Sequence, residues 1–437
     1  MFAKEKNVLD DVAIYIDENK LPNYYAESYF LYKNHLNYLS QKINKYKSYE
    51  NSSQRKDYFK ELKRAYIQNG SNTHKIVSAL EKKVTISAYE NLKINGTNNT
   101  QTTLKDYIYL RRDWTYLEEA EKQLKTTIES IKEELSKIKH KKNNSLFLGC
   151  GVGRVAFEFT DAYEKVYATD KSFSMIWHLQ KLLNSETINF FNPHEKNVHK
   201  LENVAQAYQA KIPTESLKLK NKFQAFVSDV LDLPFESGTV DSIFSIYFTD
   251  VIALKLWFKE INDKLSDSGL FIHFGPLDYF FSDEREMFTA EEFKSFFENN
   301  GYKTLVNKII ETPHLEDSNS ISYKVYRNWF FIAQKEKKTS ISQNISDNTV
   351  FKINRPISYE RKGVIKNGVK EQEVNLELPN GKFGGAQPVI QILELIDEKN
   401  TFNDLMSILK DSGLIADKGE VKGLLNDLLN QGVLTIL

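Results

Sequence analysis

The stretch Ser145-Leu-Phe-Leu-Gly-Cys-Gly-Val-Gly-Arg154, followed by Val166-Tyr-Ala-Thr-Asp170, decides the fold of this chain. An apolar strand enters a turn with three alternating glycines, a helix-like run follows, and a second strand ends in an acid. Glycine turns the backbone sharply and lets a ligand lie against it, and a helix start offers free N–H groups. Asp170 lies 17 residues after the last glycine, where a carboxylate can bind two ribose hydroxyls. The pattern predicts a nucleoside cofactor.

The composition excludes several classes of protein. The 437 residues have room for two or three domains, and 59 basic residues balance 59 acidic ones, which argues against a general nucleic-acid or membrane-surface binder. The lone cysteine, Cys150, excludes a disulfide framework and a cysteine-rich zinc site, and no metal site is expected. The chain shows no signal-peptide hydrophobic region and no apolar run long enough for a membrane span. We therefore expect a cytoplasmic protein.

Composition and the spacing of apolar residues divide the chain into four segments. Residues 1–140 are predicted to be a helical region, 141–335 an α/β domain, 336–350 a polar linker, and 351–437 a small α+β module of winged-helix-like order. The α/β domain is predicted to contain seven strands, near residues 145–149, 165–169, 223–227, 241–247, 269–274, 304–310 and 328–334.

Two stretches beside these strands allow more than one interpretation. The apolar stripe of Leu124, Ile128, Ile131, Leu135 and Ile138 predicts a helix that either packs on the core or forms a coiled coil, and the run is short for the latter. The insertion 185–222 is typical of a lid or a substrate-binding segment, although neutral packing explains it equally well.

Three further features identify the nucleoside. Phe226-Val-Ser-Asp229-Val230 gives a third strand that ends in an acid, a fourth strand ends in Tyr247-Phe-Thr-Asp250, and a helix and glycine turn lead to the strand that contains His273. In open α/β sheets ligands bind beyond the carboxyl ends of the strands, and these acids fall there with Asp170. This order resembles a class I methyltransferase that depends on S-adenosyl-L-methionine (SAM), with a Rossmann-like sheet.

The resemblance narrows to the carnosine N-methyltransferase (N2227-like) family over residues 104–335. Gly275-Pro-Leu-Asp-Tyr279 after the fifth strand, together with the upstream Arg112-Asp-Trp, is the specific part. The motifs that also match are Gly149-Cys-Gly-Val-Gly-Arg154, Asp170-Lys-Ser-Phe-Ser-Met175, Tyr247-Phe-Thr-Asp250 and Tyr326-Arg-Asn-Trp-Phe-Phe. The last 85 or so residues lie outside the resemblance.

The resemblance implies roles for individual residues. Arg112 would hold the methionyl carboxylate of SAM in a charge-assisted pair. Asp250 would contact the imidazole or amine of the substrate, and Tyr326 would line the substrate pocket. The remaining residues that it implies around SAM are Gly149, Gly151, Gly153, Arg154, Asp170, Asp229, Val230 and Tyr247.

Departures from the family motifs concern the substrate. The family has His where this chain has Phe280, and Gln where it has Tyr109, while an acid, Asp278, has appeared two residues before Phe280. Asp278 is a candidate to bind a cationic part of a substrate other than carnosine, or is a solvent-facing acid. His273 is a second candidate base, or a core histidine on an apolar strand.

We therefore expect a methyltransferase that methylates a nitrogen of a histidine- or imidazole-containing small molecule or peptide. The alternative keeps the chemistry and changes the acceptor: the module 351–437 would hold a ribosomal precursor peptide or a partner enzyme, and the core would methylate a side-chain nitrogen or sulfur. A protein that binds SAM without transfer is a third class. Neither a membrane nor a nucleic acid is an expected partner.

Overall fold

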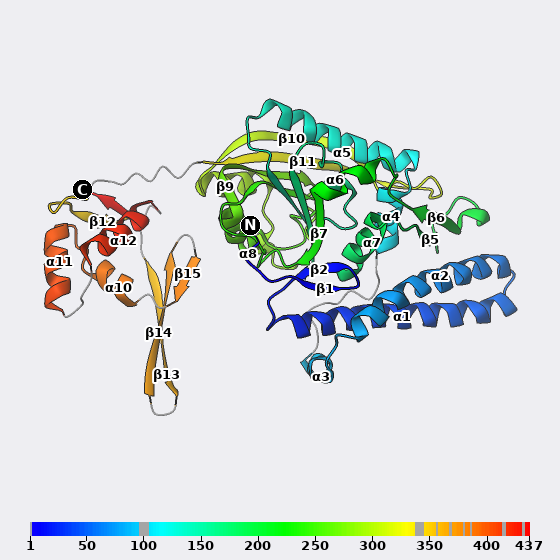
Figure 1. Cartoon of the computed structure of the whole chain (residues 1–437), viewed down its shortest axis with the longest axis horizontal. Helices are drawn as coiled ribbons and strands as arrows, with labels where there is room; N and C mark the ends of the chain where they lie inside the picture. The colour runs from blue at the N-terminus through cyan, green and yellow to red at the C-terminus, as the bar shows by residue number, and fades with distance from the viewer. Residues whose placement is uncertain are drawn as a thin grey trace. The chain divides into compact units, whose positions relative to one another are not determined.

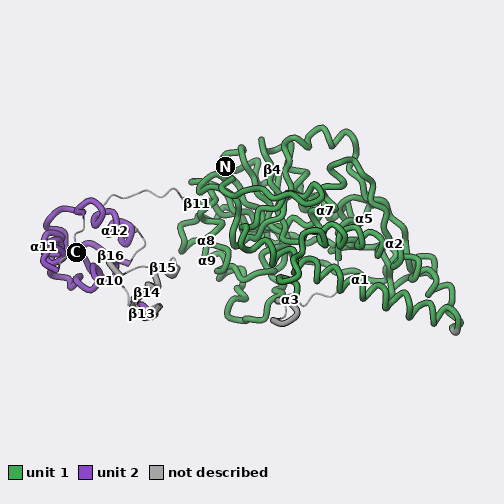
Figure 2. Tube along the Cα trace, turned by 60° about the horizontal axis from the view of Figure 1, so that its bottom comes forward, with its two compact units in different colours: residues 1–337 green, residues 338–437 purple. Residues whose placement is uncertain are grey.

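The computed structural model describes residues 2–95, 105–336, 345–354, 357–366, 369–378, 381–384, 387–412, 417–430 and 433–437. The chain divides into two compact units, Met1–Lys337 and Lys338–Leu437, which Figure 2 distinguishes by colour. Each unit is described by itself below.

A nine-stranded sheet forms the centre of the larger unit, in the order β1-β2-β7-β4-β3-β8-β9-β11-β10 (Figure 1). The strands β3, β4, β7, β8 and β9 are parallel, and β11 and β10 close the sheet as an antiparallel pair. The strands are β1 Asn7–Leu9, β2 Val12–Tyr15, β3 Asn144–Leu148, β4 Lys165–Asp170, β7 Phe223–Ser228, β8 Val240–Ile246, β9 Leu265–Gly275, β10 Tyr302–His314 and β11 Lys324–Lys335.

This sheet confirms the seven predicted strands and the Rossmann-like fold class. The chain leaves β3 in one direction to reach β4 and β7, and in the other to reach β8 and β9. Ligands bind in the crevice beyond the carboxyl ends of strands where the order reverses in this way. The fold therefore places the candidate site beyond the ends of β3, β4, β7 and β8.

The helical region predicted for residues 1–140 begins with a hairpin that the prediction did not include. The hairpin of β1 and β2 joins the sheet, and Ile14 of β2 pairs in parallel with Val227 of β7. All four residues of β2 are buried. This burial stabilises the strand although it is short. The sheet consequently has nine strands in place of the predicted seven.

Helices cover both faces of the sheet. On β3 the side chains alternate: Phe147 belongs to one apolar core, and Leu146 and Leu148 belong to the other. The helices are α1 Leu21–Ser52, α2 Lys56–Glu81, α3 Ile86–Asn95, α4 Asp106–Trp114, α5 Glu118–Lys137, α6 Arg154–Phe157, α7 Phe173–Leu183, α8 Leu254–Lys264 and α9 Ala290–Asn299. Short 3-10 helices are Leu201–Asn203, Ser216–Lys222 and Glu284–Glu286.

The helix α5 lies against the outer strand β10 (Figure 1). Acidic residues occupy its first turn and Lys137 its last, as the helix dipole favours. Leu124, Ile131 and Leu135 are buried in the core of the sheet. This packing settles the choice left open by the sequence in favour of a helix on the domain core.

The insertion 185–222 forms an antiparallel hairpin of β5 Ile188–Pro193 and β6 Ala205–Ala210. It packs on α2, where the amide of Asn69 donates to the carbonyl of Phe191 at 2.9 Å and accepts from its N–H at 2.9 Å. The N-terminal helices and the insertion therefore form one structure beside the sheet.

The smaller unit has its own apolar core, which includes Phe351, Phe402 and Leu425. Ile345, within the predicted linker 336–350, is buried in that core, while residues 337–344 lie outside the described ranges. β12 pairs with the closing strand β16, but the winged-helix assignment stays a prediction. The elements are β12 Phe351–Ile353, β13 Ser358–Lys366, β14 Val369–Leu378, β15 Gly381–Gly384, α10 Gln387–Glu394, α11 Phe402–Asp411, α12 Lys418–Asn430 and β16 Leu434–Ile436.

Within the described ranges, every helix is too short or too polar to cross a membrane.

Candidate cofactor and substrate site

The glycine turn after β3 has left-handed backbone at all three glycines, with φ of 56° at Gly149, 56° at Gly151 and 80° at Gly153. A Cβ on Gly149 would lie 2.2 Å from the Phe248 ring, and one on Gly153 would lie 2.4 Å from Leu179. A Cβ on Gly151 would meet no atom of the described chain within 4 Å. Two of the glycines thus serve packing, and Gly151 faces open space where a ligand can lie.

The expected helix behind the turn is only the four-residue α6. Its first residue, Arg154, is buried and donates to Glu158 at 2.7 Å, to the Asp113 carbonyl at 2.8 Å and to Glu121 at 3.0 Å. These donors hold α6 to α4 and α5, and the role of Arg154 at the cofactor stays a prediction. Within the turn, the Cys150 N–H donates to the Thr169 carbonyl at 2.9 Å and the Gly153 N–H donates to the Cys150 carbonyl at 2.9 Å.

Two acids end the neighbouring strands, as predicted. Asp170 accepts the Gly151 N–H at 2.9 Å and the Ser172 N–H at 2.8 Å, and its pKa is raised because burial outweighs these bonds. Asp229, at the end of β7, accepts from Lys171 at 2.8 Å. Val230 beside it is buried. The two carboxylates stand at adjacent strand ends, where ribose and adenine hydroxyl and amino groups would find acceptors.

Helix α4 brings Arg112 to this edge from the N-terminal region. Its Nε is paired with Asp113, and its two terminal nitrogens have no partner within the described residues. Although burial opposes it, Asp113 holds the pKa of Arg112 above its ordinary value. The guanidinium lies 5.3 Å from the ring centre of Tyr109, whose pKa is raised by burial and by Asp113, Asp170 and Asp250. Tyr109 therefore stands among the acids that end different strands.

Tyr247 follows β8 with a strained backbone. Its φ is 55°, which is unusual for a bulky residue, and its N–H donates to the Phe274 carbonyl at 2.9 Å. Gly275 makes this approach possible, because a Cβ there would lie 3.2 Å from the Tyr247 backbone. Strain of this kind occurs at functional sites. Here it turns the Tyr247 ring toward β10, where its hydroxyl lies 3.3 Å from the Thr312 hydroxyl.

Asp250 is the buried acid of the site, with 3% of its surface exposed. Burial and the charge of Asp278 raise its pKa to about 6. Asp278 itself is exposed, and the backbone of the next stretch is tied to the site by the Phe280 N–H, which donates to the Asp250 carbonyl at 2.9 Å. The pair offers one carboxylate that titrates near neutrality and one in solvent.

Tyr326 of β11 faces the same group. Burial raises its pKa, and Asp278, Asp250, Tyr109 and Tyr247 act in the same direction. Its ring centre lies 4.2 Å from that of His314, at the end of β10. Sequence analysis missed His314, since no motif contains it, and only the pairing of β10 with β11 brings it to Tyr326.

The sequence left His273 as either a second base or a core histidine, and its contacts are those of the latter. It is fully buried on β9, with Nδ1 at 2.9 Å from the Thr249 hydroxyl and Nε2 at 3.3 Å from the Gly275 carbonyl. Burial lowers its pKa to about 3. These are the properties of a satisfied core histidine.

Other polar groups have structural partners. His194 of the insertion lies 3.0 Å from Asp317, which is far from it in sequence. No cluster of His, Cys, Asp and Glu suited to a metal occurs in the part of the chain that the structure describes.

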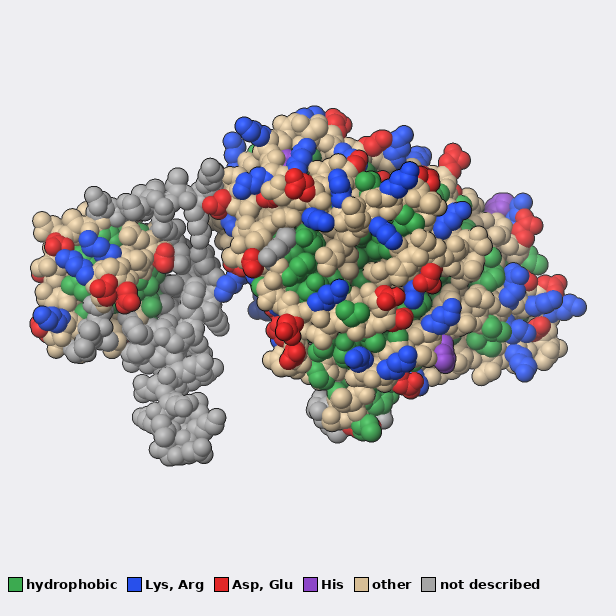
Figure 3. Space-filling view, in the orientation of Figure 1, with side chains coloured by type: hydrophobic (Ala, Val, Ile, Leu, Met, Phe, Trp, Pro, Cys, Tyr) green, Lys and Arg blue, Asp and Glu red, His purple; other side chains and the backbone are tan. Residues whose placement is uncertain are grey.

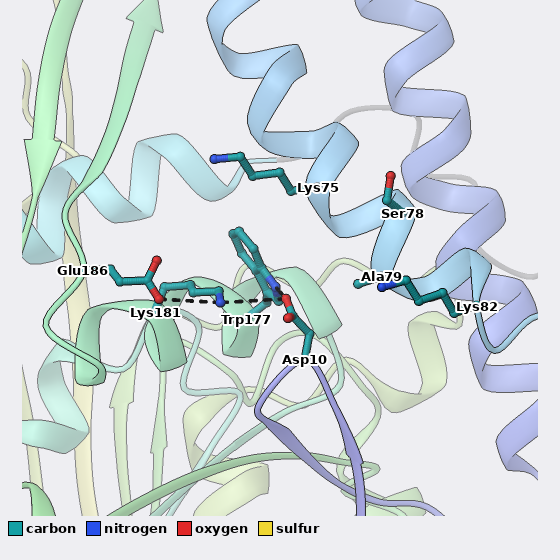
Figure 4. A pocket seen from close by; sticks show the side chains of 8 residues that line it. All are labelled: Asp10, Lys75, Ser78, Ala79, Lys82, Trp177, Lys181 and Glu186. Atoms are coloured by element: carbon teal, nitrogen blue, oxygen red, sulfur yellow. Dashed lines mark hydrogen bonds and ion pairs between the residues drawn. The ribbon is translucent and has the colours of Figure 1, made fainter.

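A pocket of about 360 Å³ lies between α2, α7 and the first hairpin (Figure 4). Lys181 lies within 3.5 Å of Glu186 and 3.9 Å of Asp10 there, and the indole N–H of Trp177 donates to Asp10. None of the eight residues that line this pocket belongs to the group described above.

The residues present fit SAM. The open face of Gly151 admits a ligand against the turn, and the terminal nitrogens of Arg112 suit a carboxylate. Asp113 Oδ2 is buried and has no partner within the described residues, so it can accept from an ammonium. Asp170 and Asp229 remain as acceptors for the nucleoside.

The comparisons with known proteins agree with this chemistry. The family model for carnosine N-methyltransferase matches residues 89–337, more than half of the chain. Comparison with curated protein sequences gave no match.

Several solved structures overlap the chain in part. A SAM-dependent methyltransferase from Aquifex aeolicus is 13% identical, with 53% of this chain and 99% of that chain covered and a TM-score of 0.33. One from Methanosarcina mazei is 13% identical, with 47% and 97% covered and a TM-score of 0.31. The PH0226 protein from Pyrococcus horikoshii is 17% identical, with 53% and 100% covered and a TM-score of 0.34.

The family assignment depends on the family model, and the cofactor follows from the family. The chain belongs to the carnosine N-methyltransferase family and is a SAM-dependent methyltransferase.

Proposed function

We propose that this protein methylates a nitrogen of an imidazole-containing small molecule or peptide. The observation that carries the proposal is Asp250, a buried carboxylate with a pKa of about 6 beyond the end of β8, within electrostatic reach of Tyr109 and Tyr326. Such an acid is mostly ionised at neutral pH and yet can take up a proton.

Each residue has a defined task in this mechanism. SAM, when bound, supplies an electrophilic methyl group. Asp250 accepts one ring N–H of a neutral imidazole, which directs the lone pair of the other ring nitrogen outward and stabilises the positive charge that develops on the ring. Tyr247 and Tyr326 border the same space. Alignment of reacting groups by such contacts contributes about 7–11 kcal/mol.

The departures from the family motifs favour a substrate other than carnosine. Phe280 replaces the family histidine, and the exposed Asp278 adds a negative charge near Asp250. A cationic group on the substrate, beside its imidazole, would pair with Asp278. Basic and acidic side chains are interspersed over the face of the larger unit shown in Figure 3, which supports a small molecule or peptide over a nucleic acid.

A panel of acceptors tests the proposal. The full-length protein with SAM is incubated with imidazoles, histidine dipeptides and longer histidine-containing peptides, and products are detected by mass spectrometry with the methylated atom located by NMR. Asp250→Asn serves as the impaired variant and Asp267→Asn, an exposed acid elsewhere, as the control. Tight binding of S-adenosylhomocysteine without transfer to any imidazole nitrogen would overturn the proposal in favour of a binding protein.

A second candidate is favoured by the smaller unit, which has its own core and lies beyond the family match. In this version Lys338–Leu437 holds a ribosomal precursor peptide or a partner enzyme, and the methyl group goes to a peptide side chain. Deletion of residues 338–437 distinguishes the two. Loss of peptide turnover with retained small-molecule turnover supports the second candidate, and equal turnover of both supports the first.

A further inference from the structure

His314 stands on the same face of the sheet as the proposed substrate site. In the pairing of β10 with β11, Thr312 is opposite Tyr326 and His314 is opposite Lys324, so these side chains project to one side. The His314 ring lies 4.2 Å from the Tyr326 ring and 5.9 Å from the Tyr247 ring, measured between centres. The imidazole is thus held against both tyrosines that border the site.

Two acceptors on this face have no partner in the described part of the chain: His314 Nδ1 and Asn328 Oδ1, both buried. The Asn328 amide nitrogen donates to the Ile310 carbonyl at 3.1 Å and to the Thr312 hydroxyl at 2.9 Å, which leaves its oxygen as the unpaired atom. Buried polar atoms nearly always have partners. Unpaired acceptors beside a substrate site therefore indicate where a substrate donor binds.

The charge state of His314 suits an acceptor. Burial lowers its pKa to about 4, and Arg112, Lys324 and Lys105 act in the same direction. A neutral imidazole with its hydrogen on Nε2 presents a lone pair at Nδ1. His314 differs in this from Asp250, which changes its charge near neutral pH.

We propose that His314 contacts the substrate, and that its Nδ1 accepts a hydrogen bond from a second N–H group, an amine or an amide, beside the imidazole that Asp250 holds. Tyr326 is related to both anchors: its ring contacts His314, and the charge of Asp250 helps to raise its pKa. This contact, which rests on the proposed function, selects substrates with two nitrogen groups over simple imidazoles.

Two substitutions of His314 distinguish its role as a hydrogen-bond acceptor from its packing against Tyr326. His314→Phe keeps a ring against Tyr326 and removes the acceptor, whereas His314→Asn places an amide oxygen near the position of Nδ1. The probes are histamine, which carries an amine besides its imidazole, and 4-methylimidazole, which lacks it. Their binding to the full-length protein saturated with S-adenosylhomocysteine is measured by calorimetry.

We expect His314→Phe to weaken histamine binding about tenfold, as loss of one hydrogen bond predicts, with less than about a twofold change for 4-methylimidazole. His314→Asn should retain most of the affinity for histamine. In the wild type, the nitrogen NMR resonance of His314 Nδ1 should shift on addition of histamine, a readout that needs no variant.

Equal histamine affinity of wild type and His314→Phe, or a wild type that binds both probes alike or neither, overturns the inference. Methyl transfer is followed in parallel to separate it from the proposed function. If the wild type methylates imidazole nitrogens and His314→Phe keeps the preference for histamine, only the His314 contact is wrong. If no imidazole nitrogen of any probe is methylated, the proposed function fails.

Discussion

The backbone N–H of Gly151 donates a hydrogen bond of 2.9 Å to Oδ2 of Asp170, and so joins the glycine turn after β3 to the end of β4. The Ser172 N–H holds the other carboxylate oxygen at 2.8 Å. The carboxylate is thereby oriented by backbone alone, and each oxygen keeps a further lone pair for a ligand. This contact positions the glycine turn and the end of β4, the two parts of the candidate cofactor site, relative to each other.

Asp170→Asn should weaken S-adenosylhomocysteine binding by about 10- to 100-fold, as loss of a charged hydrogen-bond acceptor predicts. The amide would also turn a donor toward the N–H of either Gly151 or Ser172. Calorimetry measures the change, with Asp161→Asn, an exposed acid paired with Lys132, as the control. Unchanged affinity would exclude Asp170 from the cofactor site.

Gly151→Ala and Gly153→Ala should fail in different ways. Both require left-handed backbone, which costs an alanine about 1–2 kcal/mol. The Gly153 variant also brings a Cβ to 2.4 Å from Leu179, so it should lose more thermal stability. The Gly151 variant should stay folded and lose cofactor affinity, because its methyl group enters the open space above the turn. Thermal melting with and without S-adenosylhomocysteine distinguishes them.

Arg112→Lys should weaken S-adenosylhomocysteine binding about tenfold or more, although it keeps the charge. A lysine cannot pair with Asp113 through Nε and still present a two-pronged donor to a carboxylate. The melting temperature without ligand is the control for folding. Affinity equal to that of the wild type would show that Arg112 does not hold the methionyl carboxylate.

Arg154→Met should lower the free energy of unfolding by about 1–3 kcal/mol, since it leaves Glu121 and Glu158 without their shared partner. Affinity for S-adenosylhomocysteine should remain within about twofold, because Arg154 binds α4 and α5 and not the turn face. Arg327→Met, an exposed arginine on β11, is the matched control. A large loss of cofactor affinity in a stable Arg154 variant would contradict this role.

Asp278→Asn should move the acidic limb of the pH profile to lower pH. The charge of Asp278 disfavours ionisation of Asp250, so its removal lowers the Asp250 pKa from about 6, and turnover persists in more acid solution. The comparison of kcat/KM against pH uses one imidazole substrate in both proteins, so the titration of the substrate itself cancels. If the pH profiles of the wild type and Asp278→Asn superimpose, Asp250 does not control the acidic limb.

Much of the sheet could be predicted because its strands are long and apolar. The first hairpin was missed, since its strands have three and four residues. A signal was present: Asp10 and Asp11 stand between two short apolar runs, and their φ values of 48° and 66° are those of a two-residue hairpin turn.

Individual side chains could be predicted where local sequence fixes their position, and could not where segments distant in the chain do so. The turn glycines and Asp170 lie at strand ends, so the local pattern could predict that they lie together, and the Gly151 N–H does donate to Asp170. The local pattern could not show where the side chains of Arg154 and His273 point: Arg154 donates to groups of α4 and α5, and His273 has the partners of the core histidine that the sequence also allowed. His314 lies 64 residues beyond Asp250 and only strand pairing brings it to Tyr326.

The sequence by itself determined the parallel sheet, the glycine turn and the acids at the strand ends, because the order of strands and turns dictates what lies at the carboxyl edge. Only the tertiary structure decided which side chains face that edge and with what charge. Burial sets the pKa of Asp250 and of His314, and burial depends on strands and helices that are distant in the chain.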